Sequence, residues 1–289
     1  MRSAGGADLH THSAVSDGTE SPADLIRAAV AAGLGTVALT DHDTTAGWGE
    51  AREEAGRHDI VLIPGLELST LLGFRSVHML GYLVDPQNSG LVAETERIRT
   101  ARRERAQRIV DRLSRDHDIQ WSDVVAQTMP GTTVGRPHIA DALVALGLES
   151  DRSAAFAGLL HPRAGYVEPH YAPTPLQGVR LIRAAGGVPV LAHPGASGRD
   201  RVLPEDVVGE LVEAGLFGLE LYHRENTPDG RERVAELARR FDLAVTGSSD
   251  YHGTGKPNRL GEHTTAPAVV EQILELGTGT APVGAALAG

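Results

Sequence analysis

The chain has 289 residues, of which 41% are hydrophobic and only 4% aromatic, so it can fill one large core built mostly from aliphatic side chains. It contains no cysteine, which excludes disulfides and thiolate metal sites and leaves His, Asp and Glu as possible metal ligands. The formal net charge of −11 argues against a broad nucleic-acid-binding face, but not against a phosphorylated substrate held by metal ions.

The sequence carries no sign of a membrane or export segment. The first residues lack the apolar stretch of a signal peptide. No apolar run approaches the ~18–20 residues that a membrane-spanning helix needs. We therefore expect a cytoplasmic protein without membrane contact and without an obligate protein partner.

Strand and helix patterns alternate along the first part of the chain. A strand is predicted at 7–12, and a helix follows with Ser21 as N-cap, Pro22 at its first position and Gly33 at its end. A strand at 36–40 precedes a second helix that ends near Gly56. Two further apolar runs, at 60–69 and 77–84, predict the third and fourth strands.

The pattern changes at about residue 90. The charged helix predicted at 92–113 contains six arginines between residues 97 and 108. Two interpretations stay open: a solvated helix face with Glu/Arg pairs, or a basic patch that attracts an anionic polymer. Short helical pieces continue through 121–165. We therefore divide the chain into a first barrel part at 1–90, a small helical insertion that serves as a lid at 91–168, and a second barrel part at 169–289.

Alternation resumes after Pro173. The predicted helices lie at 174–185, 204–214, 229–240 and in the tail from about 266. The predicted strands lie at 188–194, 218–223 and 243–247. About seven strands, each followed by a helix, predict an α/β fold with a (β/α) barrel short of eight strands. Its site is expected at the C-terminal ends of the strands.

Metal-ligand residue types stand at the ends of almost all these strands. His10 and His12 share one strand face because strand side chains alternate, and His42, Glu67, His193 and Asp250 occupy comparable positions. A cluster of His and carboxylate ligands suits divalent ions such as Mn, Zn or Fe. Such ions generate a hydroxide near neutral pH and stabilise a phosphoryl group, so phosphoester hydrolysis is the natural use of this set.

Seven short motifs, in this order along the chain, resemble the PHP (polymerase and histidinol phosphatase) family. They are Asp8-Leu9-His10-Thr11-His12, Ser16-Asp17-Gly18-Thr19, Leu39-Thr40-Asp41-His42-Asp43, Pro64-Gly65-Leu66-Glu67, Gly135-Arg136-Pro137-His138-Ile139-Ala140, Leu191-Ala192-His193-Pro194 and Ser249-Asp250-Tyr251-His252-Gly253. The resemblance covers residue 8 to about 261. It implies a distorted (β/α)7 TIM-like barrel, the PHP fold, and a likeness to stand-alone bacterial phosphoesterases that act on nucleotides.

By position, the resemblance implies a trinuclear metal centre. The first site would be held by His10, His12, Glu67 and Asp250; the second by Glu67, His78 and His193; and the third by Asp17, His42 and His252. Many relatives have His in place of Asp17. A carboxylate there is an acceptable oxygen ligand that can change the affinity or metal preference of the third site.

Other polar residues are candidates for binding the substrate. Arg136 is expected to contact phosphate, because a guanidinium fork matches phosphate oxygens. His138 and His223 are candidates for binding substrate or for donating a proton to the leaving oxygen, and Arg224 and Lys256 are weaker phosphate candidates. Asp250, His223 and Arg136 form the predicted catalytic set. Five further histidines lack such a context and are predicted to lie at the surface: His58, His117, His161, His170 and His263.

The sequence thus predicts a metal-dependent phosphoesterase that acts on a small phosphomonoester. An example is the 3′-phosphate of a 3′,5′-bisphosphate nucleotide, attacked by a hydroxide that bridges two metals. One alternative is a 5′→3′ exonuclease on short RNA or DNA oligonucleotides, and another is a histidinol-phosphate phosphatase. A non-catalytic metal-binding module is a different class, which the complete ligand set disfavours.

Overall fold

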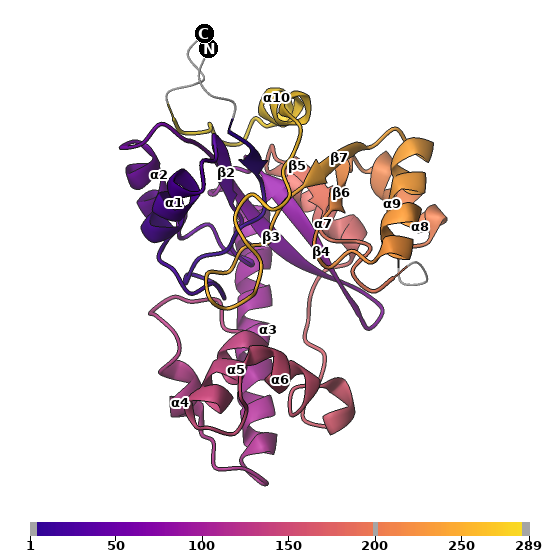
Figure 1. The fold of residues 1–289 in the computed structure, drawn as a ribbon. Coiled ribbons are helices and arrows are strands. Elements are labelled where there is room, and N and C mark those ends of the chain that lie inside the picture. Colours follow the sequence, from indigo (N-terminus) through magenta and orange to yellow (C-terminus); the bar gives the residue numbers. More distant parts are fainter. Residues whose placement is uncertain (1–4, 199–201, 285–289) are drawn as a thin grey trace.

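The computed structural model describes residues 5–198 and 202–284, and in this part seven strands form one sheet that curls into a nearly closed barrel (Figure 1). The strands follow one another in the sheet in chain order: β1 (Ala7–Asp8), β2 (Thr36–Leu39), β3 (Val61–Leu72), β4 (Arg75–Tyr82), β5 (Val188–Leu191), β6 (Gly218–Tyr222) and β7 (Ala244–Gly247). The predicted α/β class and distorted seven-stranded barrel are confirmed.

Helices flank the barrel on both sides. Figure 1 shows α1 (Pro22–Ala31) and α2 (Trp48–Ala55) beside β2, and α8 (Glu205–Glu213) and α9 (Pro228–Arg240) beside β6 and β7. Helix α7 (Pro175–Ala184) packs on β3, β4 and β5. The predicted cap of α1 is confirmed, because the Ser21 side chain accepts a hydrogen bond from the backbone N–H of Asp24 at 3.1 Å.

The first strand is shorter than the predicted 7–12. Beyond Asp8 the chain stays extended but is held by single contacts: the backbone N–H of His12 donates to the carbonyl of Tyr251 at 2.8 Å, and Thr40 N–H donates to the carbonyl of Thr11 at 2.9 Å. These contacts join the segment after β1 to β2 and to the loop after β7. The extended backbone still places His10 and His12 on one side, as the alternation predicted.

The prediction that a helix follows every strand is wrong for β3, which leads directly into β4. These strands form an antiparallel hairpin, and β4 is antiparallel to β5 as well. The hairpin turn is Gly73-Phe74, and Gly73 has the positive φ (62°) that a type II′ turn needs at its first central residue. Because β4 runs against the parallel strands, His78 near its beginning lies at the barrel end where the parallel strands finish.

Alternation along β3 separates two apolar clusters. Leu62, Leu66 and Leu68 face outward into the cluster shared with the helices, whereas Val61 and Ile63 face the barrel interior. The interior cluster also includes Val270 and Ile273 of α10 (Pro267–Leu276), which closes that end of the barrel. Burying each of these Leu and Ile side chains contributes roughly 1.5–3 kcal/mol. Glu67 continues the inward series of β3 above this apolar layer.

The helices between β4 and α7 have a hydrophobic cluster of their own, with Ile109, Ile139 and Leu143 among its buried members. In Figure 1 they lie on the opposite side of the barrel from α10. We call residues 89–164 the helical segment; its helices are α3 (Ser89–Leu113), α4 (Trp121–Val125), α5 (Arg136–Ala145), α6 (Arg152–Ala157) and the 3₁₀ helix η1 (Pro162–Ala164). The domain boundaries at residues 90 and 168 stay a prediction.

Within residues 5–198 and 202–284, no helix combines the length and apolar character needed to cross a membrane.

Candidate metal centre and its cavity

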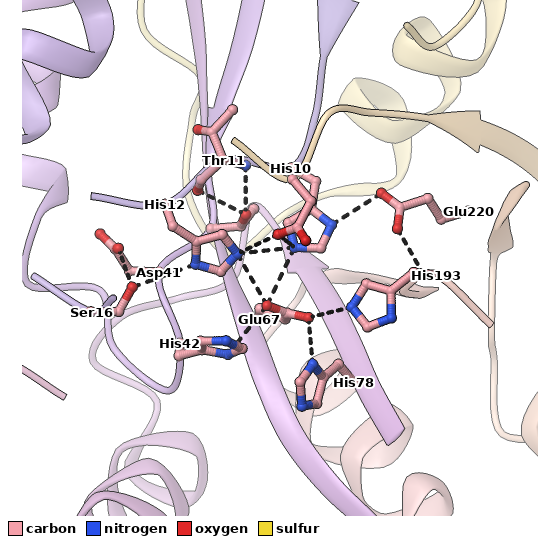
Figure 2. A network of polar contacts seen from close by, with 12 residues as sticks. His10, Thr11, His12, Ser16, Asp41, His42, Glu67, His78, His193 and Glu220 are labelled. Atoms are coloured by element: carbon pink, nitrogen blue, oxygen red, sulfur yellow. Dashed lines mark hydrogen bonds and ion pairs between the residues drawn. The ribbon is translucent and has the colours of Figure 1, made fainter. Parts of the chain in front are cut away.

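Glu67 lies at the centre of a buried cluster of imidazoles (Figure 2). Its Oε1 is 2.8 Å from His78 Nδ1 and 3.2 Å from His193 Nε2. Its Oε2 lies 3.1–3.3 Å from nitrogens of three further rings, those of His10, His12 and His42. Burial opposes ionisation, but the surrounding histidines hold the pKa of Glu67 well below its usual range. Glu67 is therefore an anionic hub.

Asp250 completes a four-residue group with His10, His12 and Glu67, whose ligand atoms all lie within 4.8 Å of one another. Asp250 Oδ1 is 3.4 Å from His10 Nε2 and 3.3 Å from His12 Nε2. The backbone of Asp250 has a φ of 55°, and that of His193 has a φ of 31°. A left-handed backbone costs energy for these residue types, so the fold holds both side chains in place against local strain.

A second carboxylate, Asp17, lies on the other side of His12. Its Oδ1 is 3.2 Å from His252 Nε2, and its Oδ2 is 3.7 Å from His42 Nε2. Burial opposes ionisation of Asp17, yet the imidazoles of His252 and His42 hold its pKa well below the usual range. The structure thus brings together all nine residues that the resemblance implied as ligands.

Several close contacts in this cluster lack the geometry of a hydrogen bond. Nδ1 of His42 and Nδ1 of His78 are close to the carboxylate of Glu67, but neither makes a hydrogen bond, and Nε2 of His252 is likewise buried without one. An unpaired buried polar atom costs about 1–3 kcal/mol. Nitrogen and oxygen atoms that converge without bonding one another fit a divalent cation between them.

Glu220 supports this cluster and was missed by sequence reasoning. Its Oε1 is 3.0 Å from His10 Nδ1, and its Oε2 accepts a hydrogen bond from the backbone N–H of His193 at 2.7 Å. The carboxylate holds the His10 ring so that Nε2 faces the cluster. The sequence did contain a signal for Glu220, because an acid within the apolar strand 218–222 is unusual.

Two other acids hold loops around the cluster. Asp41 accepts hydrogen bonds from the Ser13 backbone N–H at 2.8 Å and from Ser16 Oγ at 2.5 Å. Asp43 accepts from the Ser69 backbone N–H at 2.7 Å and from an arginine of α3. Both acids fix the loop after β2, which carries His42.

Two of the candidate substrate residues lie against Asp250. His223 is fully buried; its Nδ1 accepts a hydrogen bond from the backbone N–H of Glu225 at 3.1 Å, and its Nε2 is 3.5 Å from Asp250 Oδ2. Lys256 Nζ donates to the same Asp250 Oδ2 at 2.6 Å. His223, directly after β6, and Lys256, in the loop after β7, therefore both face the cluster.

Two more of the candidate substrate residues, His138 and Arg224, have partners within the protein. Nδ1 of His138 accepts a hydrogen bond from the backbone N–H of Gly135 at 3.1 Å, so that nitrogen caps α5. Arg224 Nε donates to Glu262 Oε1 at 2.8 Å. Arg224 borders a cavity beside the cluster, but its guanidinium is already paired.

A cavity of about 480 Å³, here called the arginine cavity, lies over Asp17, His42, His78 and His252. The helical segment supplies most of its cationic wall. Despite the net charge of −11, positive side chains dominate the lining: Arg102, Arg105, Arg136, Arg152, Arg224 and Lys256. Such a concave cationic surface attracts and concentrates anions.

The arginines of α3 divide between surface and cavity. Arg103 and Arg108 are exposed, as expected for a solvated face. Arg102 and Arg105 are buried, and Arg102 Nη1 donates to Asp43 Oδ2 at 3.0 Å. Two interpretations were left open for the arginines between residues 97 and 108, a solvated helix face and a basic patch. Neither of them describes these two buried residues.

Arg105 has few partners for its charge. Its Nη1 contacts His170 Nδ1 at 3.2 Å, and its Nε is buried without a hydrogen bond. Burial, together with the neighbouring Arg102 and Arg136, lowers the pKa of Arg105 to about 9. The surface interpretation of His170 is wrong, because this residue is half-buried and borders the cavity. Helix periodicity could not show that a loop more than 60 residues away packs against Arg105.

Comparisons with known proteins agree with the fold and the cluster. A family model described as PHP domain matches residues 8–122. The chain is 34% identical over 276 residues to the 5′-3′ exoribonuclease Rnm of Escherichia coli, covering 93% of this chain and 92% of that protein. It is also 34% identical over 265 residues to the 3′,5′-nucleoside bisphosphate phosphatase of Chromobacterium violaceum, covering 89% of this chain and 90% of that protein.

A solved structure of a metal-dependent phosphoesterase from Bifidobacterium adolescentis superposes with a TM-score of 0.92 at 45% identity, covering 95% of this chain and 97% of that chain. Similarity over nearly the whole length, together with the buried His and carboxylate cluster, confirms the resemblance. The chain belongs to the PHP family and is a metal-dependent hydrolase of phosphoric esters.

Proposed function

We propose that this enzyme removes a phosphate from a small nucleotide that carries a second phosphate, such as the 3′-phosphate of a 3′,5′-bisphosphate nucleotide. The observation that carries this proposal is the position of Arg105, which is buried, and Arg136, which is half-buried, on the cavity beside the ligand cluster. Within residues 5–198 and 202–284, neither guanidinium is paired with a carboxylate. The C. violaceum relative, named as a 3′,5′-nucleoside bisphosphate phosphatase, supports it.

We infer that two to three divalent ions occupy the cluster, with His10, His12, Glu67 and Asp250 as the first ligand group. Glu67 with His78 and His193 would form the second group, and Asp17 with His42 and His252 the third. Mn, Zn and Fe suit this mixture of imidazole and carboxylate ligands. When bound, such ions lower the pKa of water and neutralise phosphoryl oxygens.

The protein's own residues then position the ester. Arg136, at the first turn of α5, lies over the Phe156 ring at 5.3 Å and borders the cavity, so its guanidinium is available to phosphoryl oxygens. Nδ1 of His223 accepts a backbone hydrogen bond, and Nε2 is the ring nitrogen that faces Asp250 and the cluster. His223 is therefore suited to hold a proton for the leaving oxygen.

Arg105 and His170 would hold the second phosphate. Burial and the charge of Arg105 lower the pKa of His170 to about 2, so its ring is neutral. Its Nδ1 accepts from Arg105, which leaves the proton on Nε2, a buried atom without a partner. Nε of Arg105 is a second unpaired donor. A phosphate would satisfy both donors and relieve the repulsion among the three arginines.

A second candidate function is 5′→3′ exonuclease activity on short oligonucleotides. The E. coli relative, named as an exoribonuclease, favours it. The exonuclease reaction would break the same phosphorus–oxygen bond as the phosphatase reaction, since the two substrates differ only in the group attached to the scissile phosphate. The cytoplasmic location and the lack of an obligate protein partner stay predictions from the sequence.

Phosphate release in the presence of Mn²⁺ tests the proposed substrate. The panel should contain a nucleoside 3′,5′-bisphosphate, the matching 3′-monophosphate and 5′-monophosphate, and histidinol phosphate. We expect kcat/KM for the bisphosphate to exceed that for the 3′-monophosphate by about 10–100-fold, the usual worth of a charged hydrogen bond. Equal values for these two substrates, or the highest value on histidinol phosphate, would contradict the proposal.

The helical segment holds the loop that carries Asp17. Arg152 of α6 donates from Nη1 to the carbonyl oxygen of Asp17 at 3.0 Å, while its Nε and Nη2 bind Asp141 at 2.5 and 2.6 Å. The backbone N–H of Thr133 donates to the carbonyl of Val15 at 3.0 Å. The position of the proposed third-group ligand thus depends on the helical segment.

Replacing Arg152 by Met should weaken metal binding at the third group by about 10–100-fold, as for other residues that orient a ligand. The measurement is Mn per chain after equilibration at a series of free Mn²⁺ concentrations, with no assay of activity needed. Arg163→Met, at an exposed arginine of the same segment, is the matched control. If Arg152→Met kept the wild-type Mn content at limiting Mn²⁺, this would contradict the prediction that Arg152 positions Asp17 for metal binding.

A further inference from the structure

A second cavity borders the ligand cluster, and Arg105 does not line it. It has a volume of about 740 Å³ and lies between the β3–β4 hairpin and the loop after β5, with His78 and His193 in its wall. We call it the hairpin cavity. Ser76, His78, Arg136 and Glu225 border both this cavity and the arginine cavity. The cluster is therefore open to two separate spaces that meet at His78.

Phe74 stands at the outer border of the hairpin cavity. Its side chain is 93% exposed, more than any other large hydrophobic residue in the described part of the chain. The two-residue turn Gly73-Phe74 joins paired strands, so Phe74 is carried on an ordered hairpin, not on a long loop. In Figure 1 the hairpin end projects from the barrel, away from α10.

The rest of the wall suits an aromatic ring system joined to polar groups. Leu72, Val77 and Leu191 supply apolar surface, and Arg75, Ser76 and Ser197 supply polar atoms. Phe74 precedes His78 by four residues, which corresponds to about 13 Å along an extended strand. That separation is comparable with the length of one nucleotide whose phosphate lies at the cluster. A nucleobase is the ligand part that stacks on an exposed aromatic ring.

The chemistry of the proposed substrate shows what would occupy this space. In a 3′,5′-bisphosphate nucleotide, water oxygen bonds to the 3′-phosphorus, the P–O3′ bond breaks, and the 3′-oxygen takes a proton, giving a 5′-monophosphate and inorganic phosphate. In a 5′-phosphorylated oligonucleotide the same bonds form and break. The released phosphate then stays on the second nucleotide as its new 5′-phosphate. The two substrates differ only in what is attached to the scissile phosphate.

We propose that the hairpin cavity is a subsite for the second nucleotide of a 5′-phosphorylated oligonucleotide, with its base stacked on Phe74. The first nucleotide would lie in the arginine cavity, with its 5′-phosphate at Arg105 and His170. A bisphosphate nucleotide leaves the hairpin cavity empty, whereas a dinucleotide fills it. This inference rests on the proposed function and extends it from one substrate to two.

Phe74→Ala tests the subsite, because a side chain that is 93% exposed can be removed without disturbing the core. With a 5′-phosphorylated dinucleotide, kcat/KM should fall about tenfold, within the range measured for base–aromatic stacking. With a nucleoside 3′,5′-bisphosphate it should stay unchanged. Phe74→Trp should preserve or raise the dinucleotide value. Leu276→Ala, at an exposed apolar residue of α10, is the control.

A dinucleotide whose second base is missing separates stacking from other effects. If Phe74 stacks on that base, Phe74→Ala should not change kcat/KM on the abasic dinucleotide, because the two deletions then remove the same interaction. Equal loss on the intact and abasic dinucleotides, no loss on either, or an equal loss on the bisphosphate would overturn the inference. So would a wild-type enzyme that hydrolyses the bisphosphate but not the dinucleotide. A wild-type enzyme inactive on both would instead refute the proposed function.

Discussion

Glu67→Gln is expected to abolish turnover while the fold survives. The substitution keeps the shape of the side chain but removes the charge from the hub that five imidazoles surround at 2.8–3.3 Å. Glu67 belongs to both the first and the second proposed ligand group, and an uncharged amide would hold a cation less strongly than a carboxylate, so at least one proposed metal should be lost. Because metals supply several kcal/mol of charge stabilisation, kcat should fall by at least about 10³-fold. Phosphate release and metal content per chain measure the two effects.

Far-UV circular dichroism should be unchanged for Glu67→Gln, because the apolar cluster below the hub remains filled. Glu275→Gln, at an exposed position of α10, is the control and should retain activity and metals. A Glu67→Gln enzyme with its full metal content and wild-type kcat would show that Glu67 is not the bridging ligand.

Arg105→Met should separate substrates that carry a second phosphate from those that do not. Removing a buried charged donor costs about 1.5–3 kcal/mol, so kcat/KM for a nucleoside 3′,5′-bisphosphate should fall about 10–100-fold. The value for the matching 3′-monophosphate should stay near that of the wild type, because the proposed site for the second phosphate is then unused. Steady-state phosphate release on the two substrates gives the comparison.

The same variant has an expected effect on stability. Without an anion, Arg102, Arg105 and Arg136 repel one another, so an apolar side chain at 105 should leave the melting temperature of the ligand-free protein unchanged or raise it. Arg103→Met, an exposed neighbour on α3, should change neither property. An equal loss of activity on both substrates would assign Arg105 to the scissile phosphate and not to the second one.

The sequence was most informative where chemistry and strand periodicity coincide. His10 and His12 share a face because their backbone is extended, and their motif could be identified without any tertiary contact. Direction along the sheet was harder to predict: an apolar run such as 77–84 shows that a strand exists but not which way it runs. The prediction of a helix after each strand was therefore wrong for β3, because only Gly73-Phe74 lie between β3 and β4.

Residues that act through distant partners could not be found from the sequence. Arg105 and His170 are 65 positions apart and meet only because α3 packs beside the chain that leads into α7. On a helix rich in arginine, no pattern distinguishes the two buried members from their exposed neighbours. Glu220 is the opposite case, since a single acid within an apolar strand could have been taken as a signal.

The β3–β4 hairpin joins Glu67 and His78 to the Phe74 turn through one continuous ladder of strand pairs. Side chains keep their facing when a strand gains or loses residues in twos. Lengthening both arms by two residues between the ladder pair Ser69–His78 and the turn would move Phe74 outward by about 7 Å without turning the ligands away from the cluster. If the second base stacks on Phe74 as proposed, the length of the hairpin arms would set the distance between that base and the bond that is cut.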